Sequence, residues 1–467
     1  MVNGFEYTKI KSKKLPSTWQ KEGVLGELEH FLQENWEQRS IFYSDYQITS
    51  RQQFIDFDRK DGIKLQNYVG TIIFKGEQLN IFPKIFKEDE DDYDTDDLEL
   101  NDLIGNLVYW LEYCDRLNFP FVSMKGQLDN SENLMELFIT IYVNYVRTAI
   151  DKQRYFQYEN TTETGSFVKG KINFIDYATK KYPSGNRGAL EYTYSNFVFD
   201  NLMNRIIKCT CIFLLNISNQ TANKNTIRNI LIKLGEVETV NCSPYDCDKI
   251  HLSAMNSNYR IILSMSKMFL LNKVNSYNIG NTDAFCFLFP AEILFEGFIG
   301  GFIRDTFSDI AKVKTQASDQ YLADLLVDGE VIGNAFLLKE DILVEVGEKT
   351  FVLDTKYKEI DRFHKVKDNK KLKISDNDMK QMAIYAAKRN AEKLFLIYPL
   401  HKNEDLEEVK VSYNIHLQEQ GLLETIPLEI IKVPFAYSES KEKTRLLLKQ
   451  ILLNAMEGQK WAEQPAN

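Results

Sequence analysis

The spacing of apolar positions changes within the N-terminal part of the chain. Across residues 19–38, apolar side chains recur close to every 3.6 positions, which predicts an amphipathic helix. From residue 47 to 86, short continuous and alternating apolar runs replace that period. Two of these runs, 68–74 and 78–85, flank a short segment that contains Gly76, so they predict a pair of strands joined by a turn.

Helical periodicity returns in the middle of the chain. It predicts helices over residues 103–117, 134–150, 202–215 and 226–234, while residues 167–175 and 192–204 frame a Gly- and Ser-containing turn region near 182–188. The sequence contains no internal repeat of solenoid length. The middle of the chain is therefore expected to be helical or mixed.

The C-terminal part alternates helices with strands. The pattern predicts a helix over 287–302, two or three strands over 316–357, a helix over 376–389 that Asp376 or Asp378 caps, a strand over 393–398 and a helix over 441–456. A chain of 467 residues also exceeds what one hydrophobic core usually organises. We therefore predict a multidomain α+β protein with an N-terminal β-rich region (1–130), a helical or mixed middle domain (131–283) and a C-terminal α/β domain with a small mixed sheet (284–467).

Composition supports folded domains and limits the partners. Apolar residues make up 44% of the chain and aromatic residues 12%, so packed cores are expected. The formal net charge is −10, whereas domains that bind DNA alone are usually basic, so DNA contacts must come from local patches or from a partner. The acidic run at 88–97 is interpreted as a solvated loop between domains. Because no secretory signal and no membrane-spanning apolar stretch is present, we expect a cytoplasmic protein that does not bind membranes.

The cysteines and histidines form no recognisable metal-binding pattern. Cys209 and Cys211 are too close for a zinc knuckle, and Cys242 and Cys247 lack a matching second pair. The five histidines form no HxH or HxxxH arrangement. We expect all six cysteines to be reduced thiols in a core.

Two apolar segments rich in β-branched residues carry the candidate chemistry. They span residues 341–346 and 350–357 around a Gly-containing turn, which predicts a hairpin. Side chains alternate along a strand, so Asp354 and Lys356 share a face, and a neighbouring strand that begins with Asp341 can place its carboxylate beside Asp354. Two carboxylates on a rigid sheet can bind Mg²⁺, with Mn²⁺ as the alternative. The lysine can orient or deprotonate a water and can stabilise charge on a phosphate.

The D-x-K triplet alone is weak evidence for a site. Such triplets are common in strands, and a lysine beside a buried carboxylate also serves as a structural salt bridge. Glu296 adds context because it lies among the apolar residues of a predicted helix. Gln381 and Tyr385 lie one turn apart on another predicted helix, although a glutamine at such a position is often an ordinary surface residue.

Taken in order, these motifs resemble a known family. The series Glu296, Asp341, Asp354-Thr355-Lys356-Tyr357-Lys358 and Gln381-Met382-x-x-Tyr385 closely resembles the PD-(D/E)xK nuclease domain of the McrC family, the cleavage subunits of GTP-dependent, modification-specific McrBC restriction systems. Upstream, the segments 67–73, Ile81-Phe82-Pro83-Lys84-Ile85, 168–172 and Phe199-Asp200-Asn201-x-x-Asn204-Arg205 resemble further signatures of that family. One departure is Glu340, which stands where the family often has proline.

The resemblance implies a reaction and a division of roles. By it, the metal would be held by Asp341, Asp354 and Glu296. Lys356 would act at the water or the phosphate, and Gln381 would assist. McrC caps and stimulates a separate AAA+ GTPase hexamer, McrB, through its N-terminal part, so residues 1–130 are expected to bind such a partner. The chain contains no GxxxxGK[ST] phosphate loop and is not expected to bind nucleotide itself.

Basic residues near the candidate site are expected to contact double-stranded, modified DNA. They are Lys358, Lys365, Lys367, Lys370 and Lys371, which with Lys373 belong to a lysine-rich stretch. An equally good interpretation of the 364–373 loop is a solvated surface segment.

Three functions stay open from the sequence. The first is an active endonuclease subunit that depends on its GTPase partner. The second is an activator or cap of an AAA+ ring whose nuclease site is inactive, and the retained Asp, Asp and Lys set argues against it. The third is a stand-alone DNA repair nuclease, which the acidic net charge disfavours.

Overall fold

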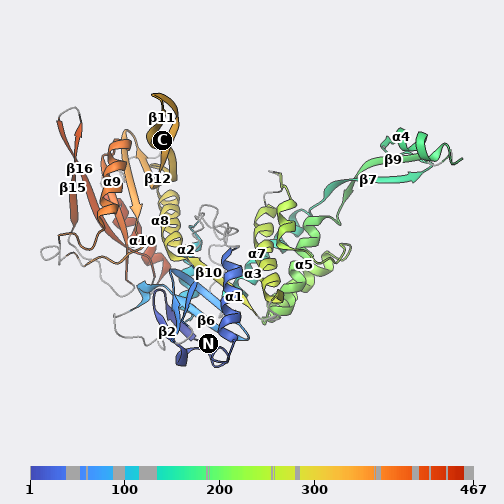
Figure 1. Ribbon diagram of the computed structural model, residues 1–467, viewed down its shortest axis with the longest axis horizontal. Helices are drawn as coiled ribbons and strands as arrows, with labels where there is room; N and C mark the ends of the chain where they lie inside the picture. The colour runs from blue at the N-terminus through green and yellow to red at the C-terminus, as the bar shows by residue number, and fades with distance from the viewer. Residues whose placement is uncertain are drawn as a thin grey trace. The chain divides into compact units, whose positions relative to one another are not determined.

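The computed structural model of the chain is shown in Figure 1. It describes residues 2–37, 53–58, 61–87, 100–114, 134–185, 188, 190–253, 256, 258–278, 284–361, 363, 370–401, 410–419, 422–437 and 440–456. The acidic run 88–97 and the lysines at 365 and 367 lie outside these residues. Among the residues that the structure describes, no helix combines the length and the apolar character needed to cross a membrane.

The chain folds into two compact units. Unit 1 contains Met1–Leu134 together with Asp283–Asn467, and unit 2 contains Met135–Thr282. The N-terminal and C-terminal regions, which the sequence suggested as separate domains, therefore share one unit. The predicted α+β class is confirmed, and the described residues form several small sheets.

Two small sheets form the N-terminal part of unit 1. The first has the strand order β1-β6-β5-β10, and the second has the order β2-β4-β3. The elements are β1 (Val2–Phe5), β2 (Lys9–Lys11), α1 (Val24–Glu37), β3 (Ile55–Asp58), β4 (Gly62–Leu65), β5 (Tyr68–Phe74), β6 (Glu77–Phe82), the short 3-10 helices η1 (Ser12–Lys14) and η3 (Lys84–Phe86), and β10 (Phe285–Pro290). The predicted strand pair is confirmed, with β5 and β6 antiparallel. The predicted helix is present but begins only at Val24.

The helix predicted over 287–302 is partly wrong. Residues 285–290 form β10, which pairs antiparallel with β5 and is buried along its whole length, and only then does α8 (Ala291–Phe307) begin. The all-apolar run before Pro290 fits a strand covered on both faces as well as it fits a buried helix, so periodicity cannot separate the two. The helix starts after Pro290, where the backbone N–H of Ala291 donates to the Asn67 carbonyl at 3.0 Å.

A six-stranded mixed sheet forms the C-terminal part of unit 1. Its order is β11-β12-β13-β14-β16-β15, with β13, β14 and β16 parallel and the other neighbours antiparallel. The elements are β11 (Lys312–Val327), β12 (Glu330–Val346), β13 (Lys349–Thr355), α9 (Asp376–Arg389), β14 (Lys393–Leu400), β15 (Val411–Glu419), β16 (Leu422–Pro434) and α10 (Lys441–Ala455). The predicted helices and strands over 376–398 and 441–456 are confirmed within a few residues, whereas β15 and β16 were not predicted.

The helices α8 and α9 cover opposite faces of this sheet. Leu343 packs in a core cluster with Met382 and Tyr385 of α9. The next residue back along the strand, Ile342, faces Gly300 of α8, where an added Cβ would lie 3.7 Å from the isoleucine side chain. Successive strand residues point to opposite faces, so the sheet is the middle layer between the two helices (Figure 1).

One helix from the N-terminal half packs against the end of this sheet. The indole N–H of Trp110 in α2 (Leu100–Leu111) donates to the Phe435 carbonyl at 2.6 Å, and the two rings stack with centroids 4.1 Å apart. The backbone N–H of Tyr437 also donates to the side chain of Asn106 at 2.9 Å. These contacts, made across more than 300 residues of sequence, explain why both ends of the chain belong to one unit. Residues 115–117, the end of the predicted helix, lie outside the described residues.

Unit 2 is a helical body that carries a strand arm. Its elements are α3 (Leu134–Lys152), β7 (Gln157–Gly165), β8 (Lys171–Ile172), α4 (Phe174–Asp176), the π-helix η5 (Tyr177–Lys181), β9 (Leu190–Val198), α5 (Leu202–Ile217), α6 (Thr221–Lys233), the 3-10 helix η6 (Pro244–Lys249) and α7 (Asn258–Asn278). The helices predicted at α3, α5 and α6 are confirmed, and α7 was not predicted. In Figure 1, β7 and β9 extend from the helices of this unit as an antiparallel ribbon.

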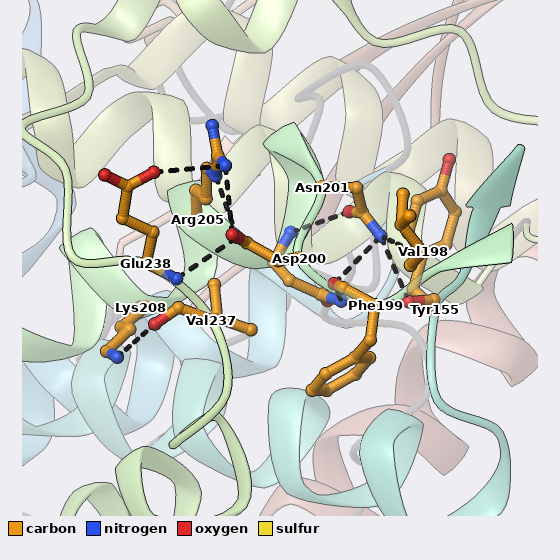
Figure 2. Close-up of polar contacts among 10 residues, drawn as sticks. Tyr155, Val198, Phe199, Asp200, Asn201, Arg205, Lys208, Val237 and Glu238 are labelled. Carbon is orange, nitrogen blue, oxygen red and sulfur yellow. Dashed lines mark hydrogen bonds and ion pairs between the residues drawn. The ribbon is translucent and has the colours of Figure 1, made fainter. Parts of the chain in front are cut away.

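A cluster of polar contacts joins the end of β9 to the start of α5 (Figure 2). Asn201 caps α5 by accepting from the backbone N–H of Asn204 at 3.2 Å, and its amide donates to the Tyr155 carbonyl at 3.3 Å. Arg205 donates twice to Asp200, at 2.8 and 3.0 Å. Residues 199–205, which form the sequence signature, therefore hold the end of β9 to the start of α5 at the base of the arm.

The six cysteines are buried free thiols, as predicted. Four of them lie in unit 2 and Cys286 lies in β10. Burial raises the pKa of Cys247 to about 12. A thiol with such a pKa stays protonated at neutral pH, so it offers neither a nucleophile nor a metal ligand there.

Candidate active site

Asp341 and Asp354 are cross-strand neighbours on β12 and β13. Ile342 pairs with Leu353 in this ladder, so the register brings Asp341 level with Asp354. Oδ2 of Asp341 accepts two hydrogen bonds of 2.8 Å from Thr355, one from the backbone N–H and one from the hydroxyl. The predicted hairpin is thereby confirmed, and one carboxylate is held rigidly against the next strand.

The predicted start of the first strand at Asp341 is wrong. Strand β12 begins at Glu330, so Asp341 lies in its second half. Most residues from 330 to 339 are exposed, without alternation of buried and exposed positions, because this part of the β11–β12 hairpin is not covered on either face. Apolar periodicity therefore gave no sign of the extra length.

Asp354 is a fully buried carboxylate. Its side chain is inaccessible to solvent, and apart from Lys356 no side chain or backbone group among the described residues donates a hydrogen bond to it. The ammonium of Lys356 forms an ion pair with Oδ2. Burial, with the nearby charge of Asp341 as the second cause, raises the pKa of Asp354 to about 7, against the opposing effect of Lys356. The raised pKa shows that Lys356 alone does not fully offset the burial of this carboxylate and the charge of Asp341.

Lys356 is held between the sheet and α9. Its Nζ lies 3.3 Å from Oε1 of Gln381, whose amide donates to the Tyr385 hydroxyl at 2.7 Å. That hydroxyl donates to the Lys339 carbonyl on β12 at 2.6 Å. Burial alone would lower the pKa of Lys356, but the charges of Asp354 and Asp341 outweigh it and raise the pKa. Lys356 is therefore a cation at neutral pH, and Gln381 contacts its ammonium.

The cap of α9 differs from the prediction. Ser375, rather than Asp376 or Asp378, caps the helix by accepting from the backbone N–H of Asp378 at 3.1 Å. Both aspartates pair with lysines instead: Asp376 with Lys371 at 2.7 Å and Asp378 with Lys358 at 3.1 Å. A serine hydroxyl is short enough to reach the third helical N–H, and the carboxylates are then available for the cations.

Two of the lysines expected to contact DNA are thus engaged within the protein. Lys358 is half-exposed and pairs with the buried carboxylate of Asp378, and Lys371 pairs with exposed Asp376. The carbonyl of Lys370 accepts from the Tyr413 hydroxyl at 2.7 Å. Lys365 and Lys367 lie outside the described residues. DNA contact by these lysines stays a prediction.

A buried ion pair supports the strand just before Asp341. Glu340 is completely buried, and Arg389 at the end of α9 donates to both of its oxygens, at 2.9 and 2.7 Å. Arg389 also contacts the exposed carboxylate of Asp319 on β11. Glu340, which stands where the resembled family often has proline, therefore links β12 to α9.

Glu296 approaches the site through a residue that the sequence did not single out. The amide of Gln316 on β11 donates to Oε1 of Glu296 on α8. On β11, Thr315 pairs with Ile342 of β12 and Ala317 pairs with Glu340. Gln316 lies between them and is therefore level with Asp341. Gln316 has a φ of +52°, a left-handed conformation that costs a non-glycine residue roughly 1–2 kcal/mol. No pattern in the sequence indicates this kink, because glutamine is ordinary in an exposed strand.

The donors fit a hard divalent cation. Two aspartates stand side by side, and among the described residues Lys356 is the cation that pairs with the buried one, so a divalent cation would add the charge that the two carboxylates still need. Within the described residues, no three His, Cys, Asp or Glu side chains are already arranged as a metal-binding group. A ligand role for Glu296 beside the two aspartates therefore stays a prediction.

Next to Lys356, the Tyr357 side chain reaches a buried carboxylate from the N-terminal sheet. Its hydroxyl donates to Oε1 of Glu6, which also accepts from the backbone N–H of Lys84 at 2.9 Å. Oε2 of Glu6 has no hydrogen-bond partner. Burial raises the pKa of Glu6 to about 7, although the bonds from Tyr357 and Lys84 act in the opposite direction.

This carboxyl makes a measurable contribution to the pH dependence of stability. The unfolded chain has a Glu6 pKa near 4.5, so between that pH and about 7 the folded state binds the extra proton. The contribution of Glu6 to the free energy of unfolding is therefore largest below about pH 4.5. It falls by about 3 kcal/mol as the pH rises to about 7 and is constant above that. We expect Glu6→Gln to remove this component. Urea unfolding of both proteins should show the variant gaining that amount relative to the wild type between pH 4.5 and 7; a constant difference would contradict the assignment.

One family model matches most of the chain, and one solved structure has a similar fold. The model of the family described as McrBC 5-methylcytosine restriction system component matches residues 63–399. A chain of the tetradecameric assembly of Thermococcus gammatolerans McrB AAA+ hexamers with bound McrC is 15% identical, with a TM-score of 0.61 over 97% of this chain and 100% of that one. A chain of the Thermococcus gammatolerans McrBC complex is 16% identical, with a TM-score of 0.47 over 65% and 86%. No curated protein matches the sequence.

Proposed function

Because this chain belongs to the family of McrBC 5-methylcytosine restriction system components, we propose that it is the DNA-cleaving subunit of such a system. The proposed reaction is metal-dependent hydrolysis of DNA phosphodiester bonds at a PD-(D/E)xK site. The observation that carries the proposal is the pair Asp341 and Asp354 beside Lys356, with Asp354 completely buried.

Each residue has a definite task in this proposal. Asp341 and Asp354 would hold Mg²⁺ or Mn²⁺, with Glu296 as a further ligand. The bound cation would polarise the phosphate and lower the pKa of a water. Lys356, charged at neutral pH, stabilises the negative charge that develops on the phosphate, and Gln381 keeps its ammonium pointed at the site.

Gln316 is expected to support the reaction through Glu296. The Gln316→Gly variant keeps the left-handed backbone without strain but removes the amide that Glu296 accepts. Loss of such a supporting hydrogen bond should lower the cleavage rate roughly tenfold. Relief of strain should hold the change in unfolding free energy to within about 1 kcal/mol. Urea unfolding and single-turnover cleavage of the same sample check this; unchanged cleavage would remove Gln316 from the site.

We also propose that this chain acts with an AAA+ GTPase partner. In the similar Thermococcus gammatolerans assembly, McrC is bound to McrB AAA+ hexamers. The net charge of −10 is poorly suited to unaided DNA binding, and a partner that holds the DNA removes this difficulty. DNA that carries 5-methylcytosine is the substrate that the family description suggests.

Reconstitution tests the proposal. The purified chain is incubated with Mg²⁺ and methylated or unmethylated plasmid, with and without the AAA+ GTPase of the same system and GTP, and nicking and phosphate release are measured together. We expect cleavage that requires the partner and GTP. Stimulated GTP hydrolysis without cleavage of either plasmid would replace the proposal with an activator of the GTPase.

A further inference from the structure

Three side chains join the N-terminal sheet to the end of β13. Nζ of Lys84 donates to the Tyr357 carbonyl at 3.1 Å and lies 4.6 Å from the centre of the Tyr357 ring. Its backbone N–H donates to Glu6, which also accepts from the Tyr357 hydroxyl. We call this cluster of Glu6, Lys84 and Tyr357 the brace. The brace contacts both the backbone carbonyl and the phenol hydroxyl of Tyr357.

Tyr357 is enclosed on its other sides as well. Its ring is 5.9 Å from that of Phe295 on α8 and 6.0 Å from that of Phe435, which follows β16. The side chain is 5% exposed. Segments from three parts of the sequence therefore contact Tyr357, so a shift of Tyr357 would also displace those segments.

The residue next to Tyr357 in the chain is the lysine of the candidate site. Strand β13 ends at Thr355, and beyond it the backbone N–H of Lys356 donates to the Ile397 carbonyl at 2.8 Å. The chain then turns, with the N–H of Lys358 donating back to the Lys356 carbonyl at 2.8 Å. Lys356 thus lies just beyond the end of β13, where one hydrogen bond to β14 and one from the following turn hold its backbone.

From these contacts we propose that Glu6 and Lys84 are positioning residues for Lys356, acting through Tyr357. The N-terminal sheet then sets the place of the ammonium relative to Asp354, and a change in that sheet alters cleavage without touching the carboxylates. The inference rests on the proposed nuclease function. Misplacing a catalytic group by about 1 Å can cost on the order of a hundredfold in rate, so a modest loosening of the brace has a large effect.

The variants are chosen to separate positioning from charge and folding. Lys84→Met removes the donor and the cation while keeping much of the side-chain volume. Lys84→Arg keeps a cation and donors for the Tyr357 carbonyl and ring. Lys9→Met is the matched control, because Lys9 also lies in the N-terminal part of unit 1 but pairs with Asp58 and Asp61 at its surface.

Two readouts are measured on each full-length protein. Hydrogen exchange over residues 354–358 reports how firmly the strand end is held, whether or not the protein cleaves DNA. Single-turnover cleavage with partner, GTP and Mg²⁺ reports the position of Lys356. We expect Lys84→Met to exchange faster at this segment and to cleave roughly tenfold to a hundredfold more slowly, with an unchanged Mg²⁺ half-saturation. Lys84→Arg should recover most of the rate, and Lys9→Met should match the wild type.

Several results would overturn the inference. They are wild-type cleavage by Lys84→Met, equal losses in Lys84→Met and Lys9→Met, or unchanged exchange over 354–358 in Lys84→Met. If the wild type itself cleaves no DNA, the proposed function fails. The exchange measurement then decides on its own whether the brace holds the strand end.

Discussion

Replacing Asp354 by asparagine is expected to lower the rate of DNA cleavage by about a thousandfold or more. Removing one of two carboxylates that hold a divalent cation should forfeit several kcal/mol of charge stabilisation in the transition state, and about 4 kcal/mol corresponds to a thousandfold. Asparagine has nearly the same shape as aspartate, but the change leaves the largely buried ammonium of Lys356 without its ion pair, so a loss of stability is expected as well. Urea unfolding at pH 8 should show that the variant is still folded under the conditions of the cleavage assay.

A matched variant on the same hairpin makes the result specific. Glu348 is exposed in the turn between β12 and β13, so Glu348→Gln removes the same charge without approaching the site. It should cleave at the wild-type rate, measured as single-turnover cleavage with partner, GTP and Mg²⁺. Stimulation of GTP hydrolysis should persist in both variants. Cleavage by Asp354→Asn within tenfold of the wild type would exclude this carboxylate from the reaction.

The largest expected effect on stability comes from Arg389. Replacing it by methionine leaves Glu340 completely buried without its cation, and breaking a buried pair in this way typically costs roughly 3–5 kcal/mol. Because Glu340 precedes Asp341, cleavage should fall as well. Chemical denaturation, followed by a probe in the C-terminal sheet, measures the loss.

The double variant separates the unpaired charge from the lost packing. Changing both Glu340 and Arg389 to methionine removes both charges together, and such replacements are often neutral or stabilising. Unfolding free energy should return to within about 1–2 kcal/mol of the wild type. If Arg389→Met alone costs less than about 1 kcal/mol, the pair is not the buried contact described above.

The central residues of the candidate site could be predicted from the sequence because strands alternate their side chains. That rule put Asp354 and Lys356 on one face, and the turn between two apolar segments put Asp341 opposite Asp354. The helical spacing of Gln381 and Tyr385 likewise corresponds to the observed chain of contacts to Lys356. These are local rules, and they act over few residues.

What the sequence could not indicate depends on contacts between distant segments. Glu6 and Lys84 contact Tyr357 across more than 270 residues of sequence. The spacing of apolar residues along the chain does not indicate contacts between segments so far apart. Gln316 depends on a backbone kink within a long strand. The apolar run at β10 is compatible with a helix or a strand, and its pairing with β5 decides between them. Partners remote in sequence thus determine both the missed strand and the missed residues.

The most direct test of the account is the dependence of cleavage on metal at this site. An end-labelled methylated duplex is cut under single-turnover conditions with partner and GTP while Mg²⁺ is varied, for the wild type and for Asp354→Asn. The account predicts saturable, Mg²⁺-dependent cleavage by the wild type that chelation abolishes, and none above background by the variant. Cleavage that persists in the variant with the same dependence on Mg²⁺ would contradict it.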